Sequence, residues 1–407
     1  MTKDEWSGKL ADARHVAAIA TAFALPLSTS AQAIAVSIYA VLALLTLDRA
    51  RFEATLRRPA AWLPVALFAL IALGVLWSVQ PFGAAVKWVG PYAKLLLIPL
   101  VMATAFTPRQ ALQVGYGLLA ACVILLALSW ASFLWPTGPW TWFKSPGVPV
   151  KDNAVQSGCF ALCAFALAVG AMHVWGADRR RAVAMIVLAL LFFADVFLIY
   201  LSKTGAIMAA ALLALFLIHA GGWRRAAIVA ASAILVIGVA LLASPQAQRR
   251  IAEIGTDISA NQGTSGGVET LSTGARLDFW NKAAGFVKQA PLTGHGTGSI
   301  KPLYQGLEAT RPSPYGEATP DPHNQTLHVV LQVGLIGGVL LWAMWFAHAR
   351  LFFARNIASI FGQAIVLQNV IGGLFNSHIS AVTQGMLYCL AVGLLGAVVT
   401  TGNKQSV

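Results

Sequence analysis

The chain has 407 residues, of which 58% are hydrophobic and only 11% are charged, and its mean hydropathy is +0.71. A soluble globular domain carries roughly 25% charged residues, so this composition excludes an ordinary soluble protein. The net charge of +13 would suggest nucleic-acid binding in a soluble chain. Here the basic residues form short clusters between apolar runs, which is typical of the loops of a membrane protein.

Two further features of the composition narrow the class. The charged N-terminal sequence MTKDEWSGKLADARH has no A-x-A-like cleavage site before the first apolar run, so we predict no cleaved signal peptide. The cysteines all fall inside apolar runs, and we interpret them as small core residues rather than disulfide partners or metal ligands. They are Cys122, Cys159, Cys163 and Cys389.

Apolar runs predict an all-α membrane protein with about twelve transmembrane helices, because a helix needs ~20 mostly apolar residues to cross a bilayer. About nine spans at 1–243 precede a polar segment at 244–326, and about three spans follow at 327–407. The predicted spans are 15–29, 31–47, 61–79, 92–106, 111–135, 154–175, 183–201, 205–220, 226–243, 327–347, 361–376 and 381–399.

The loop charges predict the orientation of these spans. One set of connections is rich in arginine, and both ends of the chain belong to the same side. The opposite short connections hold only lysines, which are Lys87, Lys94, Lys144, Lys151 and Lys203. Because positive loops stay in the cytoplasm, we expect both termini inside and the segment 244–326 outside. In a Gram-negative cell this segment would lie in the periplasm, and the chain would be a multi-pass protein of the inner membrane.

The segment 244–326 is the only sizeable polar region, and we expect it to contain helical structure. After a Gly/Ser/Thr-rich stretch at 261–274, Ser272 or Thr273 is a suitable cap for a helix that runs to about Gln289. The apolar residues of this helix share one face at helical spacing: Phe279, Ala283, Phe286 and Val287. Pro291 ends it, and the Pro- and Gly-rich residues 301–322 are expected to be irregular.

The run GHGTGS at 294–299 is loosely similar to a glycine-rich phosphate loop. It neither follows a predicted strand nor opens a convincing helix, so we interpret it as a tight turn at the membrane surface. Motifs for ATP, zinc, a sugar-nucleotide metal site or a G-x-S-x-G nucleophile are all missing. We therefore predict no cofactor and no metal.

What remains is a set of polar residues at the predicted outer membrane face. Lys203 lies in LSKTG, Arg276 in STGARLDFW and His323 in PDPHNQTLH, while Lys87 and Lys94 flank the outer end of the short fourth span. Each basic residue alone is typical of an interfacial side chain that extends to the lipid headgroups. Together they converge on one face beside the polar segment, which favours a functional site.

His323 is the candidate proton acceptor, because imidazole titrates near pH 6.5 and takes up a proton at neutral pH. Asp321 and Asn324 flank it. The alternative is an interfacial hydrogen-bonding residue. His328 and His378 are rivals, and we expect His328 to pack between helices.

Two further features keep two interpretations each. Asp195 lies within a predicted span, and it is either a functional carboxylate or half of a structural ion pair with Lys203. The aromatic cluster PWTWFK at 139–144 is either an interface belt or a surface on which sugars stack.

These elements resemble those of the O-antigen ligase and polymerase superfamily of membrane glycosyltransferases. Ser-Lys-Thr-Gly at 202–205 is similar to the family's Ser-Arg-Gly element. STGARLDFW, APLTGHGTGS and PHNQTLHVVLQVGLIGG are similar to its loop arginine, its Pro-hydrophobic-Gly-x-Gly turn and its His-Asn before an apolar span. The similar part runs from about 185 to 345. One departure is Lys203, where the family usually has arginine, since lysine lacks the bidentate fork.

The resemblance implies a metal-independent, inverting enzyme that transfers O-antigen from undecaprenyl diphosphate to a sugar of the lipid A core. Twelve spans and a compact loop are more similar to the ligase than to the polymerase or the protein oligosaccharyltransferases of the superfamily. His323 would be the base, with Arg276 and Lys203 on the diphosphate, and Lys87, Lys94 and Asn324 in the substrate site. The partners would be the two lipid-linked substrates and membrane lipids, without nucleic acid. A transporter or flippase for an anionic lipid is the alternative from another class.

Overall fold

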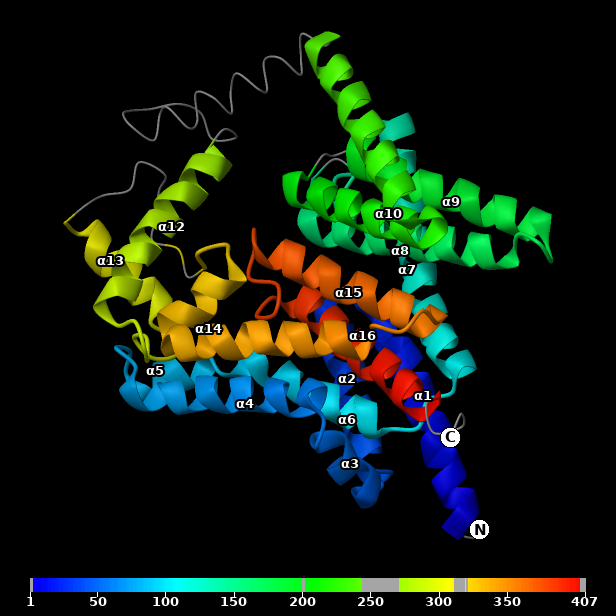
Figure 1. Ribbon diagram of the computed structural model, residues 1–407. Helices are drawn as coiled ribbons and strands as arrows, with labels where there is room; N and C mark the ends of the chain where they lie inside the picture. Colours follow the sequence, from blue (N-terminus) through cyan, green and yellow to red (C-terminus); the bar gives the residue numbers. More distant parts are fainter. Residues whose placement is uncertain are drawn as a thin grey trace.

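A computed structural model describes residues 3–145, 147–199, 202–243, 271–310, 319 and 321–402. The regular secondary structure of this part of the chain is entirely helical, apart from an isolated bridge between Ser145 and Val148. The prediction of an all-α protein is confirmed. Figure 1 shows α4 (Pro59–Leu73), α14 (Gln325–Leu351) and α15 (Ile357–Gly373) running alongside one another, with α12 (Leu271–Gln289) and α13 (Ile300–Glu308) at one end of this body.

The N-terminal elements are α1 (Lys3–Ala24), α2 (Thr29–Leu45), α3 (Arg49–Leu56), α4 (Pro59–Leu73), η1 (Gly74–Trp77), α5 (Phe82–Lys87), η2 (Gly90–Leu96) and α6 (Leu97–Ala103). The central helices are α7 (Pro108–Leu134), α8 (Asn153–Val174), α9 (Arg179–Leu198) and α10 (Lys203–Ala243). The remaining helices are α12 (Leu271–Gln289), α13 (Ile300–Glu308), α14 (Gln325–Leu351), α15 (Ile357–Gly373) and α16 (Val382–Gly402).

The chain is a multi-pass membrane protein, but the predicted count of twelve spans is not confirmed. Among the described residues, seven helices are long and apolar enough to cross a bilayer, or up to eight if the bent pair Thr29–Leu45 and Arg49–Leu56 forms one span. The predicted spans 92–106 and 361–376 correspond to the shorter apolar helices Gly90–Ala103 and Ile357–Gly373. The predicted spans 205–220 and 226–243 both fall in α10, whose backbone is non-helical at Gly222, with φ 77°. Apolar windows do not show whether a short or broken helix completes a crossing.

Side-chain caps explain where many of these helices begin. Asp152, Asp178, Asn324 and Asn356 each accept a hydrogen bond from a backbone N–H in the first turn of α8, α9, α14 and α15. Such caps satisfy one of the N–H groups that lack a partner at a helix start. Inside the body, α14 packs on α4 and α15, while α8 packs on α9 and α10. This packing brings the start of α14 and the end of α15 together at one end of the body (Figure 1).

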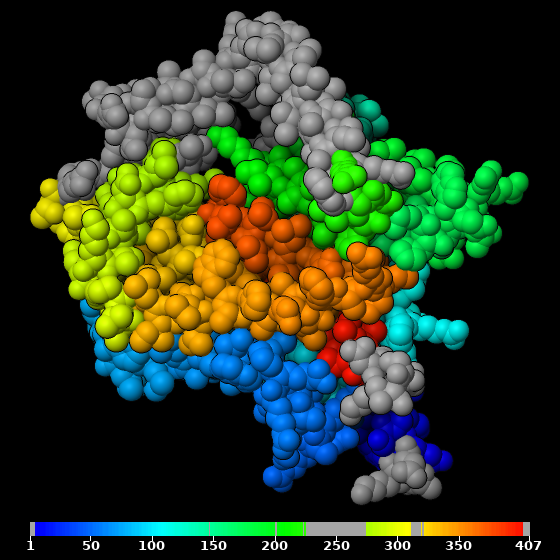
Figure 2. All heavy atoms as spheres, in the orientation of Figure 1, coloured from blue at the N-terminus to red at the C-terminus, as the bar shows by residue number. Residues whose placement is uncertain are grey.

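The predicted helix after the Gly/Ser/Thr-rich stretch is α12, and it ends at Gln289 as expected. Phe279, Ala283 and Phe286 are buried, whereas Val287 is only partly buried. They form a small satellite core with Tyr304 of α13 and Leu331 of α14, apart from two larger hydrophobic clusters of the described residues. Burying each phenylalanine contributes about 1.5–3 kcal/mol. This satellite core fixes α12 on α14, and Figure 2 shows the two packed surfaces in contact.

The prediction that residues 301–322 are irregular is wrong for the first part, because Ile300–Glu308 forms α13. Its apolar residues Ile300, Leu303, Tyr304 and Leu307 recur at helical spacing and contact α12. The Tyr304 hydroxyl donates to the Phe279 carbonyl at 2.7 Å. Tertiary contact therefore outweighs the local Pro and Gly content, while residues 311–318 and 320 lie outside the described part.

The run GHGTGS is a tight turn, as predicted, and it joins α12 to two helices of the body. Gly294, Gly296 and Gly298 all have φ between 65° and 85°, a region that favours glycine. The backbone N–H of Thr297 donates to the Gly74 carbonyl at 2.9 Å, and that of Val79 donates to the His295 carbonyl at 3.1 Å. The turn therefore fastens the polar segment to the end of α4 and η1.

The same turn supplies hydrogen-bond donors to carbonyls at a break in α14. The backbone of α14 departs from helical geometry at Val333 and Gly334. The carbonyls of Leu331 and Gln332 accept hydrogen bonds from the N–H groups of His295 and Gly296 at 2.9 and 2.8 Å. These N–H groups are therefore occupied by protein carbonyls, which argues against a phosphate-binding role for this turn.

We expect Gly296→Ala to lower the free energy of unfolding by at least about 2 kcal/mol. A Cβ at position 296 would lie 2.1 Å from Cα of Ser78, and φ of 85° adds strain. Gly285→Ala is the matched control, because that helical position has nothing within 4 Å. It should be neutral or stabilising by up to about 1 kcal/mol. Thermal unfolding in detergent measures both, and equal melting temperatures would contradict the anchoring role of the turn.

Candidate active site

His323 lies just before α14 in an unusual backbone conformation. Its φ is 53°, and it is the one non-glycine residue of the described part with a positive φ. Its N–H donates to Oδ1 of Asp321 at 2.8 Å, which closes a short side-chain turn. A left-handed residue costs about 1–3 kcal/mol and persists only where its surroundings enforce it. Such strain is a feature of functional sites, so the contacts that hold His323 are informative.

Helix α12 holds this segment from one side. The ring of Phe279 stacks on the imidazole of His323, with centroids 6.3 Å apart and planes at 29°. The indole N–H of Trp280 donates to the carbonyl of Pro322 at 3.0 Å. Arg276 lies one helical turn before Trp280, and therefore on the same side of α12.

Arg276 is electrostatically coupled to this segment. Burial lowers the pKa of its guanidinium, and the negative charge of Asp321 acts in the opposite direction. Arg276 and His323, two predicted site residues that are far apart in the sequence, thus lie on elements that contact each other.

The loop between α15 and α16, residues 374–381, holds the segment from the other side. The Ser377 hydroxyl donates to Oδ1 of Asp321 at 2.6 Å. Nδ2 of Asn324 donates to the Leu374 carbonyl at 3.1 Å. The Asn324 side chain also caps α14 through the Leu327 N–H. Asn324 is thus a structural link between two elements, in addition to any contact with substrate.

The imidazole itself is also bonded to this loop. Nδ1 of His323 lies 3.3 Å from Oδ1 of Asn376. One ring nitrogen is therefore engaged by protein.

Lys94 forms hydrogen bonds with the 374–381 loop. Its ammonium donates to the carbonyls of Ser380 and Ala381 at 3.2 and 2.6 Å. Two of its three N–H bonds are therefore used inside the protein. In the structure Lys94 fixes the loop that contacts His323, which is a different role from the predicted contact with a diphosphate.

Lys203 and Lys87 are both exposed, and they lie on other elements. Lys203 begins α10, which packs on α8, α9 and α15. Gly205 approaches Ser157 of α8 so closely that a Cβ would lie 2.4 Å from the Ser157 Cβ. Lys87 is in the last turn of α5. Their predicted contact with substrate stays a prediction.

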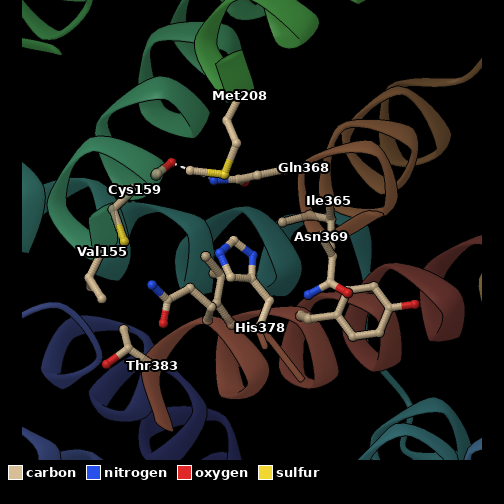
Figure 3. Close-up of a pocket in the computed structure, with 12 residues that line it drawn as sticks. Val155, Cys159, Met208, Ile365, Gln368, Asn369, His378 and Thr383 are labelled. Atoms are coloured by element: carbon tan, nitrogen blue, oxygen red, sulfur yellow. Dashed lines mark hydrogen bonds between the residues drawn. The ribbon is translucent and has the colours of Figure 1, made fainter. Parts of the chain in front are cut away.

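A cavity connects the start of α10 with the 374–381 loop (Figure 3). Its volume is about 20 Å³, which is room for about one water molecule and too little for a sugar ring. Met208 of α10, Gln368 of α15, His378 of the loop and Thr383 of α16 are among the residues that line it. Gln368 also donates to the carbonyl of Gly158 at 2.6 Å, which joins α15 to α8.

The rival histidines are both buried. His328 accepts or donates a 2.7 Å hydrogen bond with the Tyr92 hydroxyl, in agreement with its predicted packing between helices. His378 is 2% exposed, and burial lowers its pKa to about 4. Neither ring is exposed, whereas His323 is half-buried, so His323 remains the candidate base.

Asp195 is buried within α9, and its neighbours are Ser129 of α7 and Gln156 of α8. The aromatic cluster forms a packed group, in which Trp140 contacts Trp135 and Phe143 at centroid distances of 6.0 and 5.2 Å. Both of the interpretations given for each feature stay open.

Three residues of the site were not singled out by the sequence: Asp321 as a hydrogen-bond acceptor, Asn376 and Ser377. The proximity of Asp321 to His323 in the chain was visible, but its bonds to the 374–381 loop were not. Asn376 and Ser377 lie in a short connection, FNSHIS at 375–380, with polar residues between two apolar runs. Polar residues in such a connection are a weak signal of hydrogen bonds to another element.

Comparisons with known proteins test the resemblance. The family model described as O-antigen ligase matches residues 188–342, which is less than half of the chain. No curated protein matched the chain. The matched segment contains the start of α10, Arg276, the glycine turn and His323. The resemblance to the O-antigen ligase family, predicted from the sequence, is therefore confirmed over residues 188–342.

Proposed function

We propose that this protein is an O-antigen ligase, which transfers a glycan from undecaprenyl diphosphate to a sugar of the lipid A core. The observation that carries the proposal is that α12, which bears Arg276, contacts the segment that bears Asp321 and His323, inside the part of the chain that matches the family. A cation and a proton acceptor on adjoining elements are the two groups that glycan transfer from a diphosphate requires. The site faces the periplasm in this proposal, as the loop charges predict.

The cation acts on the leaving group. When the bond between the anomeric carbon and the diphosphate oxygen breaks, the electron pair stays on the diphosphate, whose negative charge rises. Arg276 is suited to bind two phosphate oxygens through its planar fork. Lys203 supplies a second positive charge from α10, and Lys87 at the end of α5 is a further candidate for contact with the diphosphate. No ATP is needed, because the sugar–diphosphate bond already carries the driving energy.

The base acts on the acceptor. His323 takes the proton of the attacking sugar hydroxyl as its oxygen bonds to the anomeric carbon. Attack from the face opposite the diphosphate inverts the configuration at that carbon. Among the described residues no group of three metal-ligating side chains occurs, and the proposed chemistry assigns the charge role to Arg276 and Lys203.

The other members of the superfamily, polymerases and protein oligosaccharyltransferases, would use the same donor with a different acceptor. A transporter of an anionic lipid is the alternative from another class. Transporters use broken helices whose free backbone groups bind the solute at mid-membrane depth. The break in α14 favours the enzyme, because the carbonyls of Leu331 and Gln332 are already bonded to the glycine turn.

Reconstitution tests the function directly. We expect purified protein in liposomes to transfer glycan from the lipid-linked donor to lipid A-core, and to keep this activity in EDTA. Lipid A without core sugars, a second donor unit and a peptide serve as alternative acceptors. Growth of the donor glycan would indicate a polymerase, and transfer to peptide an oligosaccharyltransferase. Donor movement across the bilayer without transfer would indicate a transporter, and loss in EDTA restored by one divalent ion would overturn metal independence.

Substitutions at Arg276 test the charge site. We expect Arg276→Ala to reduce transfer by at least about 10²–10³-fold, the usual cost of losing one donor to a developing charge. Arg276→Lys should be partly or wholly defective, because the bidentate contact is lost. Lys203→Ala should be impaired and Lys203→Arg active.

Lys288→Ala is the matched control, since Lys288 is an exposed cation in the last turn of the same helix. It should retain activity and expression. Transfer by Arg276→Ala at the wild-type rate would remove Arg276 from the mechanism.

Substitutions at His323 test the base. We expect His323→Ala to lose about 10²–10⁴-fold in turnover while donor binding persists, with partial recovery at high pH where more hydroxyl is ionised. His323→Gln and His323→Asn keep a hydrogen-bond donor without basicity and should both be inactive. The asparagine variant is the fairer test of chemistry, because asparagine tolerates a positive φ.

His173→Gln is the control, an exposed histidine at the far end of α8. His328→Ala is a poorer control, because it would remove a hydrogen-bond partner of the buried Tyr92 hydroxyl. Near-native turnover by His323→Asn at neutral pH would show that no proton acceptor is needed at this position.

A further inference from the structure

The bond between His323 and Asn376 determines which ring nitrogen of His323 is free. Oδ1 of a carboxamide accepts hydrogen bonds and does not donate them. With Oδ1 of Asn376 facing Nδ1 of His323 at 3.3 Å, this contact is a hydrogen bond in the tautomer that carries its proton on Nδ1. In a neutral imidazole the other nitrogen, Nε2, then carries the lone pair. Only a nitrogen with a lone pair can take a proton from an acceptor hydroxyl.

We propose that Asn376 is a positioning residue, which holds the proton on Nδ1 of His323 and presents the Nε2 lone pair to the acceptor hydroxyl. The inference rests on the proposed function, because it gives His323 the role of base. Asn376 acts through His323 and contacts no reacting atom itself. The arrangement follows the general logic in which a base is oriented by a third group.

Contacts around Asn376 and His323 restrict the geometry of the hydrogen bond between them. The N–H of Asn376 donates to the Gly372 carbonyl at 2.9 Å, so the residue is fixed to the last turn of α15. The neighbouring Ser377 bonds to Asp321, two residues before His323. On the opposite side, the ring of Phe279 stacks on the imidazole and limits its rotation. With Lys94 bonded to two carbonyls of the same loop, Asn376 has little freedom to move away from His323.

Other ionisable groups also interact electrostatically with His323 or its neighbour Asp321, and none of these residues is replaced in an Asn376 variant. They are Asp321 before it, Arg276 on α12, Tyr304 on α13, His328 on α14 and His378 in the 374–381 loop. A change in the pH dependence of an Asn376 variant therefore reports on the Asn376–His323 bond.

The enzymatic test compares the pH dependence of transfer in three variants. Asn376→Ala should lower kcat by at least about tenfold with a smaller change in KM for the donor, because the wrong tautomer is populated. Asn376→Asp keeps the acceptor but adds a negative charge, which favours the imidazolium. The base must be neutral to work, so the acidic limb of the profile should move to higher pH by roughly one unit or more.

Asn356→Asp is the matched control, since Asn356 is a helix cap at the opposite end of α15 and aspartate caps equally well. Its profile should superpose on that of the wild type. A profile of Asn376→Asp that also superposes on the wild type, or an Asn376→Ala variant with wild-type kcat, would overturn the proposal.

A second measurement is independent of activity. In protein labelled with ¹⁵N-histidine, protonated and unprotonated ring nitrogens have widely separated chemical shifts, and the His323→Asn spectrum identifies the signals of His323. We expect Nδ1 protonated and Nε2 unprotonated in the wild type, and a mixture in Asn376→Ala. Nε2 protonated in the wild type would refute the positioning role. If the wild type transfers no glycan, the proposed function fails, whereas this spectrum still decides the Asn376–His323 bond.

Discussion

The arrangement of the site depends on how the broken backbone of α14 is satisfied. In an apolar surrounding every backbone N–H and C=O needs a partner, because an unpaired group costs several kcal/mol. The break at Val333 and Gly334 frees carbonyls that a continuous helix would use itself. The glycine turn at 294–298 supplies the missing N–H groups, and it approaches the break closely enough only because Gly294 and Gly334 lack side chains. A helix break in the membrane body thereby becomes the attachment point of the polar segment.

This attachment determines where α12 lies, and α12 brings Arg276 and Phe279 to His323. The 374–381 loop approaches the same histidine from the opposite side, fixed by Lys94. His323 thus lies between two elements that are separated by about a hundred residues in the chain. The contacts from both sides are what hold its backbone at a φ of 53°. A strained backbone conformation of this kind persists only where several independent contacts oppose its relaxation.

Apolar periodicity predicted the helical class and most helix positions, because lipid-facing and buried helices both need long apolar runs. It predicted α12 and its buried face. The roles of His323 and Arg276 were inferred from their placement around the polar segment, and they stay predictions. Apolar periodicity missed α13, whose helix depends on packing against Phe279 and Phe286 rather than on local propensity. The hydrogen bonds of Lys94 to the carbonyls of Ser380 and Ala381 could not be predicted from a charge near a span end, and the predicted contact of Lys94 with substrate stays a prediction. The contact of Asn376 could not be predicted from the sequence either, because its partner His323 lies 53 residues earlier in the chain.

The chemical identity of residue 376 fits a base that works near neutral pH. A base must be unprotonated before it reacts, so its pKa cannot lie far above the working pH. An aspartate at 376 would hold the same tautomer, but its charge would favour the imidazolium and leave less of the base free. Asp321 already places one carboxylate two residues from His323, and Arg276 offsets its charge from α12. A neutral asparagine adds orientation without a further negative charge, and it would also avoid repelling the diphosphate of the proposed donor.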